Sequence, residues 1–232
     1  DACVESVVDW AMVGIFSNAG QVCSATSRLL VGRALAPRLL EALHEATARL
    51  RVGDPLDEAT QLGALVPAYA RDSVLSHISR ARSDGATLLC GGEKPDVAPH
   101  LRDGFYVEPT VLTDVPVDSA AWSEEIFGPV LCVRTFDTED EAVALANASP
   151  YGLAHAVMSA DDERCSRVAS RLEAGTVWAN ASQPVWPQTP FGGWKASGIG
   201  HEWGEAGMRE YLRYKTITRT RTEHSWRHYS ST

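Results

Sequence analysis

Apolar residues recur at helical spacing in several segments of the chain. Positions 39, 43, 46 and 50 carry apolar side chains at intervals of three or four residues, which places them on one helix face. Thr138 and Glu141 form a capping box that opens a second helix, running to about residue 148. The same spacing predicts helices over residues 5–16, around 74–81, around 165–172 and near 201–212.

Short apolar runs between these segments predict β-strands over residues 28–32, 86–90, 105–112, 129–136, 154–159 and 176–180. Pro109 indicates that the third of them lies at a sheet edge or is merely extended. Residues 214–220 alternate between apolar and polar positions, as a strand with one exposed face does. Strands separated by helices predict an α/β fold with a mostly parallel sheet flanked by helices.

Composition and charge exclude several classes of protein. The chain has 232 residues, of which 44% are hydrophobic and 22% are charged, so an ordinary buried core is expected. The net charge of −9 argues against a nucleic-acid partner. No apolar stretch approaches the roughly 20 residues that a membrane-spanning helix needs, so no membrane segment is expected. The first residues, Asp1 to Val4, have the pattern of a helix interior, and we expect the chain to be a fragment.

Five scattered cysteines form no C-x-x-C pair. This pattern argues against a disulfide framework or a zinc site, and it favours a reducing, intracellular compartment. We therefore expect no metal. Four of the thiols lie in helix or strand patterns and are interpreted as small core residues, namely Cys3, Cys90, Cys132 and Cys165.

The fifth thiol, Cys23, belongs to the segment 20–25 (GQVCSA), on a predicted turn between a helix and a strand. A cysteine on such a turn is reachable, and neighbouring backbone N–H groups can stabilise its thiolate. The alternative for an isolated cysteine is again a small core residue.

Two further segments have candidate chemistry. Residues 122–129 (WSEEIFGP) place adjacent acidic residues before a Gly-Pro turn, where one carboxylate could accept hydrogen bonds from both hydroxyls of a ribose. The alternative is a solvated turn. Residues 180–184 (NASQP) and 190–198 (PFGGWKASG) form a long loop after a strand, and loops of this kind often line a pocket. Their glycines do not make a dinucleotide fingerprint.

In this order, the three patterns resemble the aldehyde dehydrogenase superfamily, with its GQxC, EEIFGP and PFGGxKxSGxG motifs. The resemblance extends to about residue 220, and segments such as QVCSATSRLLV and GTVWANASQP look most like plant and algal betaine aldehyde and aminoaldehyde dehydrogenases. It implies that residues 1–212 form an N-terminally truncated catalytic region with the aldehyde dehydrogenase fold. Residues 213–232 would be an oligomerisation strand and a polar tail. The dinucleotide-binding domain of the family would be absent from this chain.

The resemblance also implies a mechanism. The Cys23 thiolate would attack the aldehyde carbon, hydride would pass to NAD, and water would hydrolyse the resulting thioester. The backbone N–H of Cys23 would be one oxyanion donor. By motif position, Glu125 would hold the nicotinamide ribose and Phe127 would pack beside it. Glu202 matches a second family glutamate, a possible proton relay, with a solvated carboxylate at a helix start as the alternative.

The aldehyde pocket is implied at Phe191 and Val185, with Ser17 at a position where betaine-type relatives often carry Trp. Relatives also often carry Trp where this chain has Phe191. Aromatic faces bind quaternary ammonium groups, so these changes weaken the case for a trimethylammonium substrate and favour a smaller amino-aldehyde or a broader set. Arg28 and Lys195 belong to the motifs and are interpreted as structural partners.

The family's general-base glutamate and a second oxyanion donor lie upstream of the first residue of this chain, so we expect no turnover by this chain alone. The final strand of the family pairs with a partner subunit, which predicts a homodimer or tetramer. Two alternatives remain: a truncated, non-catalytic subunit that pairs with full-length protein, and an aldehyde dehydrogenase that transfers its acyl group to coenzyme A. Cytoplasm and plastid both remain open as compartments.

Overall fold

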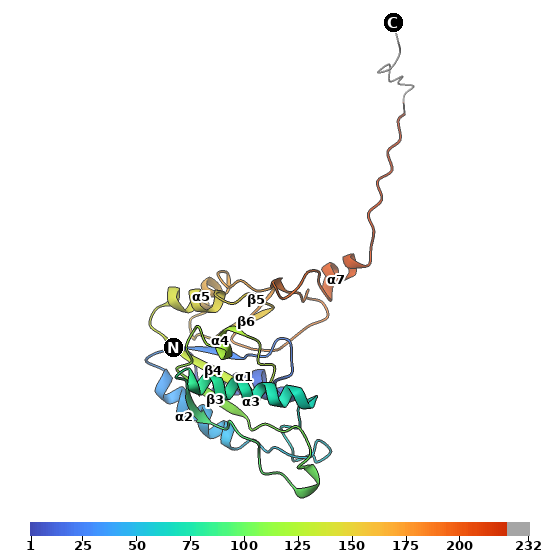
Figure 1. The fold of residues 1–232 in the computed structure, drawn as a ribbon. Helices are drawn as coiled ribbons and strands as arrows, with labels where there is room; N and C mark the ends of the chain where they lie inside the picture. Colours follow the sequence, from blue (N-terminus) through green and yellow to red (C-terminus); the bar gives the residue numbers. More distant parts are fainter. Residues whose placement is uncertain (222–232) are drawn as a thin grey trace.

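Four strands form the central sheet, in the order β1-β4-β3-β2. In this computed structural model, which describes residues 1–221, β1 (Arg28–Gly32), β4 (Val130–Phe136) and β3 (Thr110–Thr113) run parallel (Figure 1). β2 (Thr87–Cys90) is antiparallel to β3. Two further pairs complete the strands: β6 (Ala154–Val157) parallel to β7 (Thr176–Ala179), and β5 (Tyr151–Gly152) antiparallel to β8 (Trp194–Lys195). The α/β class with a mostly parallel sheet is therefore confirmed.

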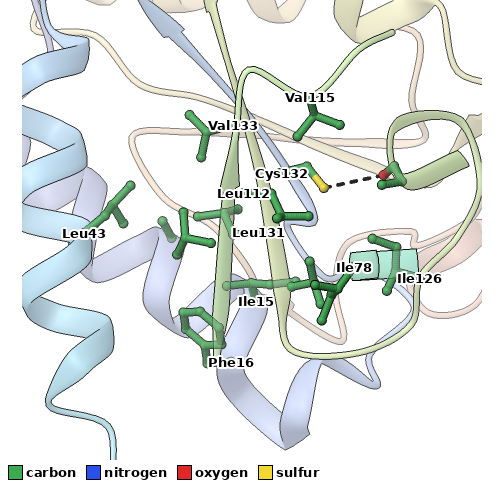
Figure 2. Close-up of a cluster of buried hydrophobic side chains, with 14 of the residues drawn as sticks. Ile15, Phe16, Leu43, Ile78, Leu112, Val115, Ile126, Leu131, Cys132 and Val133 are labelled. Carbon is green, nitrogen blue, oxygen red and sulfur yellow. Dashed lines mark hydrogen bonds between the residues drawn. The ribbon is translucent and has the colours of Figure 1, made fainter. Parts of the chain in front are cut away.

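Helices cover both faces of the central sheet. Figure 2 shows strand side chains such as Leu131 lying between Leu43 and Phe16 on one side and Ile78 and Ile126 on the other. Because each helix presents one apolar face, the two layers close over the sheet. The α-helices are α1 (Val4–Phe16), α2 (Ala36–Ala48), α3 (Ala68–Ser83), α4 (Ala120–Ser123), α5 (Glu139–Asn147), α6 (Asp162–Ala169) and α7 (Gly204–Glu210).

The predicted capping box is present with one change. The Thr138 hydroxyl accepts a hydrogen bond from the Glu141 N–H, as a capping box requires. The Glu141 carboxylate reaches one residue further back, to the N–H of Asp137. α6 begins with an analogous cap, because the Asp161 carboxylate accepts from the N–H groups of Glu163 and Arg164. Both helix starts are therefore fixed by side chains.

Two sequence predictions of local structure were wrong. β3 begins at Thr110 rather than at 105, because Pro109 has no N–H to give to a ladder. The chain does not start inside a helix, since α1 begins at Val4 and the Asp1 carboxylate binds Ser159 and Arg164. The predicted oligomerisation strand stays a prediction, because its partner would be a second subunit: residues 213–221 are exposed and extend away from the body (Figure 1). The rest of the predicted polar tail, residues 222–232, lies outside the described residues.

The burial of the cysteines agrees with the prediction, with one exception. Cys132 and Cys165 are buried, and burial raises the pKa of Cys132 to about 12. Cys90 is half-buried in β2, and its pKa is also raised by burial. Cys3 is not a core residue: it is exposed before α1, where its thiol donates to the Glu5 carboxylate. Among residues 1–221 no cluster of side chains could hold a metal ion, and no helix is long and apolar enough to span a membrane.

A cavity of about 1010 Å³ lies between β1 and β6, with α1 and α5 at its sides. Each of these strands pairs on one edge within the described chain, β1 with β4 and β6 with β7. Arg28 and His155 line the cavity, and the Nε of Arg28 and the Nε2 of His155 are buried without a hydrogen-bond partner in residues 1–221. Burial lowers the pKa of His155, and the charges of Lys195 and Arg28 lower it further.

Candidate active site

Cys23 lies on an exposed turn between α1 and β1. The chain leaves α1 at Ser17 and passes through three residues with positive φ, Asn18 (49°), Ala19 (54°) and Gly20 (74°). The Asn18 side chain donates to the carbonyl of Gln21, which stabilises this left-handed turn. The backbone N–H groups of Cys23 and Ser24 form no hydrogen bond with an acceptor in residues 1–221.

The turn is tied to the segment before α3 by Gln21. The Gln21 side chain donates to the carbonyl of Val66 at 2.7 Å and accepts from the Val66 N–H at 3.0 Å. A side-chain amide paired with one backbone unit in this way fixes both the position and the orientation of the loop. The GQxC pattern thus places an anchor two residues before the thiol.

The second motif packs directly on the first. A Cβ added to Gly20 would overlap the main-chain carbonyl of Gly128, so the two backbones approach as closely as glycine allows. Gly128 in turn packs on the side chain of Val74 in α3. The segment 124–128 therefore lies against the turn that carries Cys23.

Glu125 and Phe127 are both exposed on this segment, and Phe127 has a positive φ of 53°. The Glu125 carboxylate accepts no hydrogen bond from the described residues. Its neighbour Glu124 differs, because its carboxylate meets Nε2 of the buried His77 at 3.2 Å. The two adjacent glutamates therefore have different surroundings. The Glu124 carboxylate contacts His77 of α3, whereas the Glu125 carboxylate has no hydrogen-bond partner in residues 1–221.

The third motif reaches the same turn from the other side. Gln183 exchanges two hydrogen bonds with Ser24, at 2.7 and 2.6 Å. The Ser182 hydroxyl lies 2.9 Å from that of Thr26. The loop that follows β7 is therefore attached to both residues that flank Ala25, next to the turn of Cys23.

Phe191 and Glu202 are joined through their backbones. Each donates its N–H to the carbonyl of the other, at 2.8 and 2.7 Å, and the Phe191 ring lies 5.9 Å from that of Trp203. The Glu202 carboxylate is exposed and forms no hydrogen bond with Cys23. Val185 is 44% exposed on the loop between β7 and Phe191.

Arg28 and Lys195 are structural partners, as the sequence indicated. Arg28 donates to the Ser149 hydroxyl and the Glu124 carbonyl, and its guanidinium lies 5.9 Å from the ring centroid of Trp122. Lys195 donates to the carbonyls of residues 147 and 149 and forms an ion pair with a glutamate at 173. These contacts connect the second and third motifs to the segment between α5 and β5.

The structure thus brings the turn of Cys23, the segment of Glu125 and Phe127, and the start of the loop of Val185 into one region. No hydrogen bond joins Glu202 to Cys23 among the described residues. Ser17 is exposed at the end of α1, before the turn. Sequence reasoning missed the roles of Gln21, Gln183 and the Gly128 backbone. Their motifs were visible, but the contacts join positions that are 45 to 159 residues apart.

The three motifs lie together on an α/β fold, and residues 1–217 match the model of the aldehyde dehydrogenase family. The chain belongs to the aldehyde dehydrogenase family.

Its relatives identify a narrower group. The chain is 46% identical over its full length to a chloroplastic betaine aldehyde dehydrogenase of Atriplex hortensis, and 48% identical over 96% of its length to aminoaldehyde dehydrogenase 2 of Zea mays. These matches cover 45% and 44% of the relatives, so the chain spans about half the length of the curated relatives it matches.

Solved structures agree with this. A point mutant of betaine aldehyde dehydrogenase from Staphylococcus aureus, crystallised with NAD+, superposes with a TM-score of 0.96 at 40% identity. The match covers 100% of this chain and 47% of that one.

Proposed function

We propose that this protein oxidises an aldehyde to a carboxylic acid with NAD, through a covalent intermediate on Cys23. One observation carries the proposal. Cys23 lies exposed on a turn with two free backbone N–H groups, and the Gly20–Gly128 contact holds the segment of Glu125 against that turn. A nucleophile, oxyanion donors and a free carboxylate thus lie in one region.

The chemistry follows from sulfur. The Cys23 thiolate forms a C–S bond with the aldehyde carbon, and the negative charge that develops on oxygen is met by the N–H groups of Cys23 and Ser24. When bound, NAD supplies the hydride acceptor. In the second half of the reaction, water attacks the acyl carbon and the C–S bond breaks. Sulfur then leaves as thiolate.

The residues of the second motif fit a ribose. A carboxylate can accept from two neighbouring hydroxyls, and the Glu125 carboxylate has no competing partner in residues 1–221. Phe127 would pack beside it. Glu202 is proposed as a proton relay for the hydrolytic step. Because no hydrogen bond joins it to Cys23 among the described residues, it would have to act through solvent or after a movement.

For the substrate we propose an amino- or betaine aldehyde, which is what several relatives are named for. Phe191 and Val185 would line the pocket, together with Ser17 at the end of α1. The tilted Phe191–Trp203 pair uses part of the aromatic surface of this loop. We therefore favour a small amino-aldehyde over a trimethylammonium aldehyde.

We further propose that residues 213–221 pair with a second subunit. Their side chains are exposed, including Tyr214 and Ile217, and an extended apolar segment without a partner favours association. The described cysteines are all free, which supports a reducing compartment.

The first test is the intact mass of the native polypeptide from its source, together with NADH formation by the purified protein and its Cys23→Ser variant. A mass about twice that of 232 residues, with turnover that C23S abolishes, supports the proposal. A native mass equal to 232 residues, in complex with a longer chain, would support a non-catalytic subunit instead. An acyl product formed only on addition of coenzyme A would indicate the thioester-forming class.

A further inference from the structure

Gln183 makes contacts that the chemistry above does not use. Its side-chain oxygen accepts from the Ser24 hydroxyl at 2.7 Å, and its side-chain nitrogen donates to the Ser24 carbonyl at 2.6 Å. Both hydrogen bonds converge on the residue directly after Cys23. We propose that Gln183 is a positioning residue, which holds Cys23 and its N–H groups in the arrangement that acyl transfer to sulfur requires. This inference rests on the proposed function of Cys23.

The pair of hydrogen bonds needs a carboxamide. The glutamine carboxamide offers an N–H donor and an oxygen acceptor side by side on one planar group, as this pair of bonds requires. A glutamate of the same shape would keep the acceptor for the Ser24 hydroxyl but would lose the donor for the Ser24 carbonyl. The two bonds can therefore be separated by substitution.

The residues on either side of Gln183 are fixed as well. The buried Ser182 lies 2.9 Å from Thr26, hydroxyl to hydroxyl, and the Pro184 carbonyl accepts from the Trp178 indole at 2.7 Å. Gln183 itself has a φ of 78°, a region that favours glycine. A non-glycine residue persists there only where its surroundings hold it, and such residues cluster at functional sites.

The loop becomes exposed to solvent directly after residues 182–184. Val185 is 44% exposed, and the chain stays exposed until it reaches Phe191. The same loop therefore begins at the nucleophile turn and ends at the proposed substrate pocket. Through Gln183, a shift of the loop is transmitted to the residue beside the thiol.

Two probes of Cys23 separate positioning from exposure. With p-nitrophenyl acetate, sulfur attacks the ester carbonyl carbon, the bond to nitrophenolate breaks with its electron pair, and the acetyl group stays on sulfur. This reaction needs an oxyanion donor, whereas alkylation by iodoacetamide needs only an accessible thiolate. Peptide mass spectrometry distinguishes Cys23 from the other four thiols.

We expect Gln183→Ala and Gln183→Glu to slow acetylation of Cys23 by about tenfold to a hundredfold while leaving its alkylation unchanged. Gln188→Ala is the matched control, because Gln188 is exposed in the same loop and its side chain forms no hydrogen bond in residues 1–221. Ser24→Ala removes one of the two bonds and should have a smaller effect. In the Gln183→Ala background it should add nothing, as expected for coupled partners.

An unchanged ratio of acetylation to alkylation in Gln183→Ala would overturn the inference, as would an equal loss in Gln188→Ala. If circular dichroism shows that Gln183→Ala is unfolded, Gln183→Glu and Ser24→Ala decide the question. A wild-type protein whose Cys23 is alkylated but never acetylated would overturn the proposed nucleophile itself.

Discussion

Gly20 and Gly128 pack backbone against backbone, so that a Cβ on Gly20 would overlap the Gly128 carbonyl oxygen. The contact joins two motifs that lie more than 100 residues apart in the sequence. Gly20 also has a positive φ of 74°. The close approach therefore requires glycine at this position, and the positive φ independently favours it.

Gly20→Ala should lower the free energy of unfolding by about 2 kcal/mol or more, since it combines steric overlap with backbone strain. Gly85→Ala is the control. Gly85 also has a positive φ, 109°, but a Cβ there meets no atom within 4 Å. Urea denaturation of both variants separates the effect of the steric overlap from that of the positive φ. Equal losses in the free energy of unfolding would show that the close approach does not contribute to stability.

Glu125→Gln should weaken binding of NAD by about tenfold to a hundredfold in the form of the protein that turns over. The reason is that hydrogen bonds to a charged acceptor contribute about 1.5–3 kcal/mol. The KM for NAD should rise more than kcat falls. Glu124→Gln, which alters the contact with His77 instead, should lower the melting temperature and leave the KM for NAD unchanged.

Lys195→Met should destabilise the protein by about 1.5–3 kcal/mol, because it leaves two carbonyls and Glu173 without their cation. Arg33→Ala is a useful comparison. The Arg33–Asp137 pair is short, at 2.6 Å, but both side chains are about 60% exposed, so its loss should cost less than about 1 kcal/mol. Equal melting temperatures for the two variants would contradict this order.

Stability should fall as the pH is lowered through 6.5, the usual pKa of histidine. Burial lowers the pKa of His155 in the folded protein, so the unfolded chain takes up its proton first, and protonation favours unfolding. His155→Phe should flatten the pH dependence of the free energy of unfolding between about pH 5 and 7. An unchanged slope in this variant would show that His155 is not the group responsible.

Truncation after Leu212 should leave the melting temperature of the isolated chain unchanged, since residues 213–221 are exposed and make no ladder within it. If the proposed subunit contact is correct, the truncated protein should be monomeric by light scattering while the longer form associates. Association that survives the truncation would place the interface elsewhere.

Much of the fold could be predicted from the sequence, because its signals are local. The spacing of Leu39 and Leu43 predicted α2, and the Thr138 cap predicted the start of α5. Pro109 already argued against a regular strand over all of residues 105–112. Residues 214–220 show the limit: their alternation is genuine, but a strand needs a neighbour, and none is available within the described chain.

The candidate site could also be predicted only in part. The motifs that contain Cys23, Glu125 and Phe191 were recognisable as sequence, and their resemblance to a family supplied their roles. The contacts that hold them together were not, because a hydrogen bond such as Gln183–Ser24 has no periodicity and joins residues 159 positions apart. Which of the two adjacent acids was free also depended on the position of His77.

The anchored residues 182–184 also define where the protein can be recombined. Residues 182–184 form hydrogen bonds with Ser24, Thr26 and Trp178, so a segment from a relative that replaced them would lack matched partners. From Val185 onward the loop is exposed until Phe191. A chimaera that exchanges only this stretch would change the proposed substrate pocket and keep the hydrogen bonds that hold the turn of Cys23.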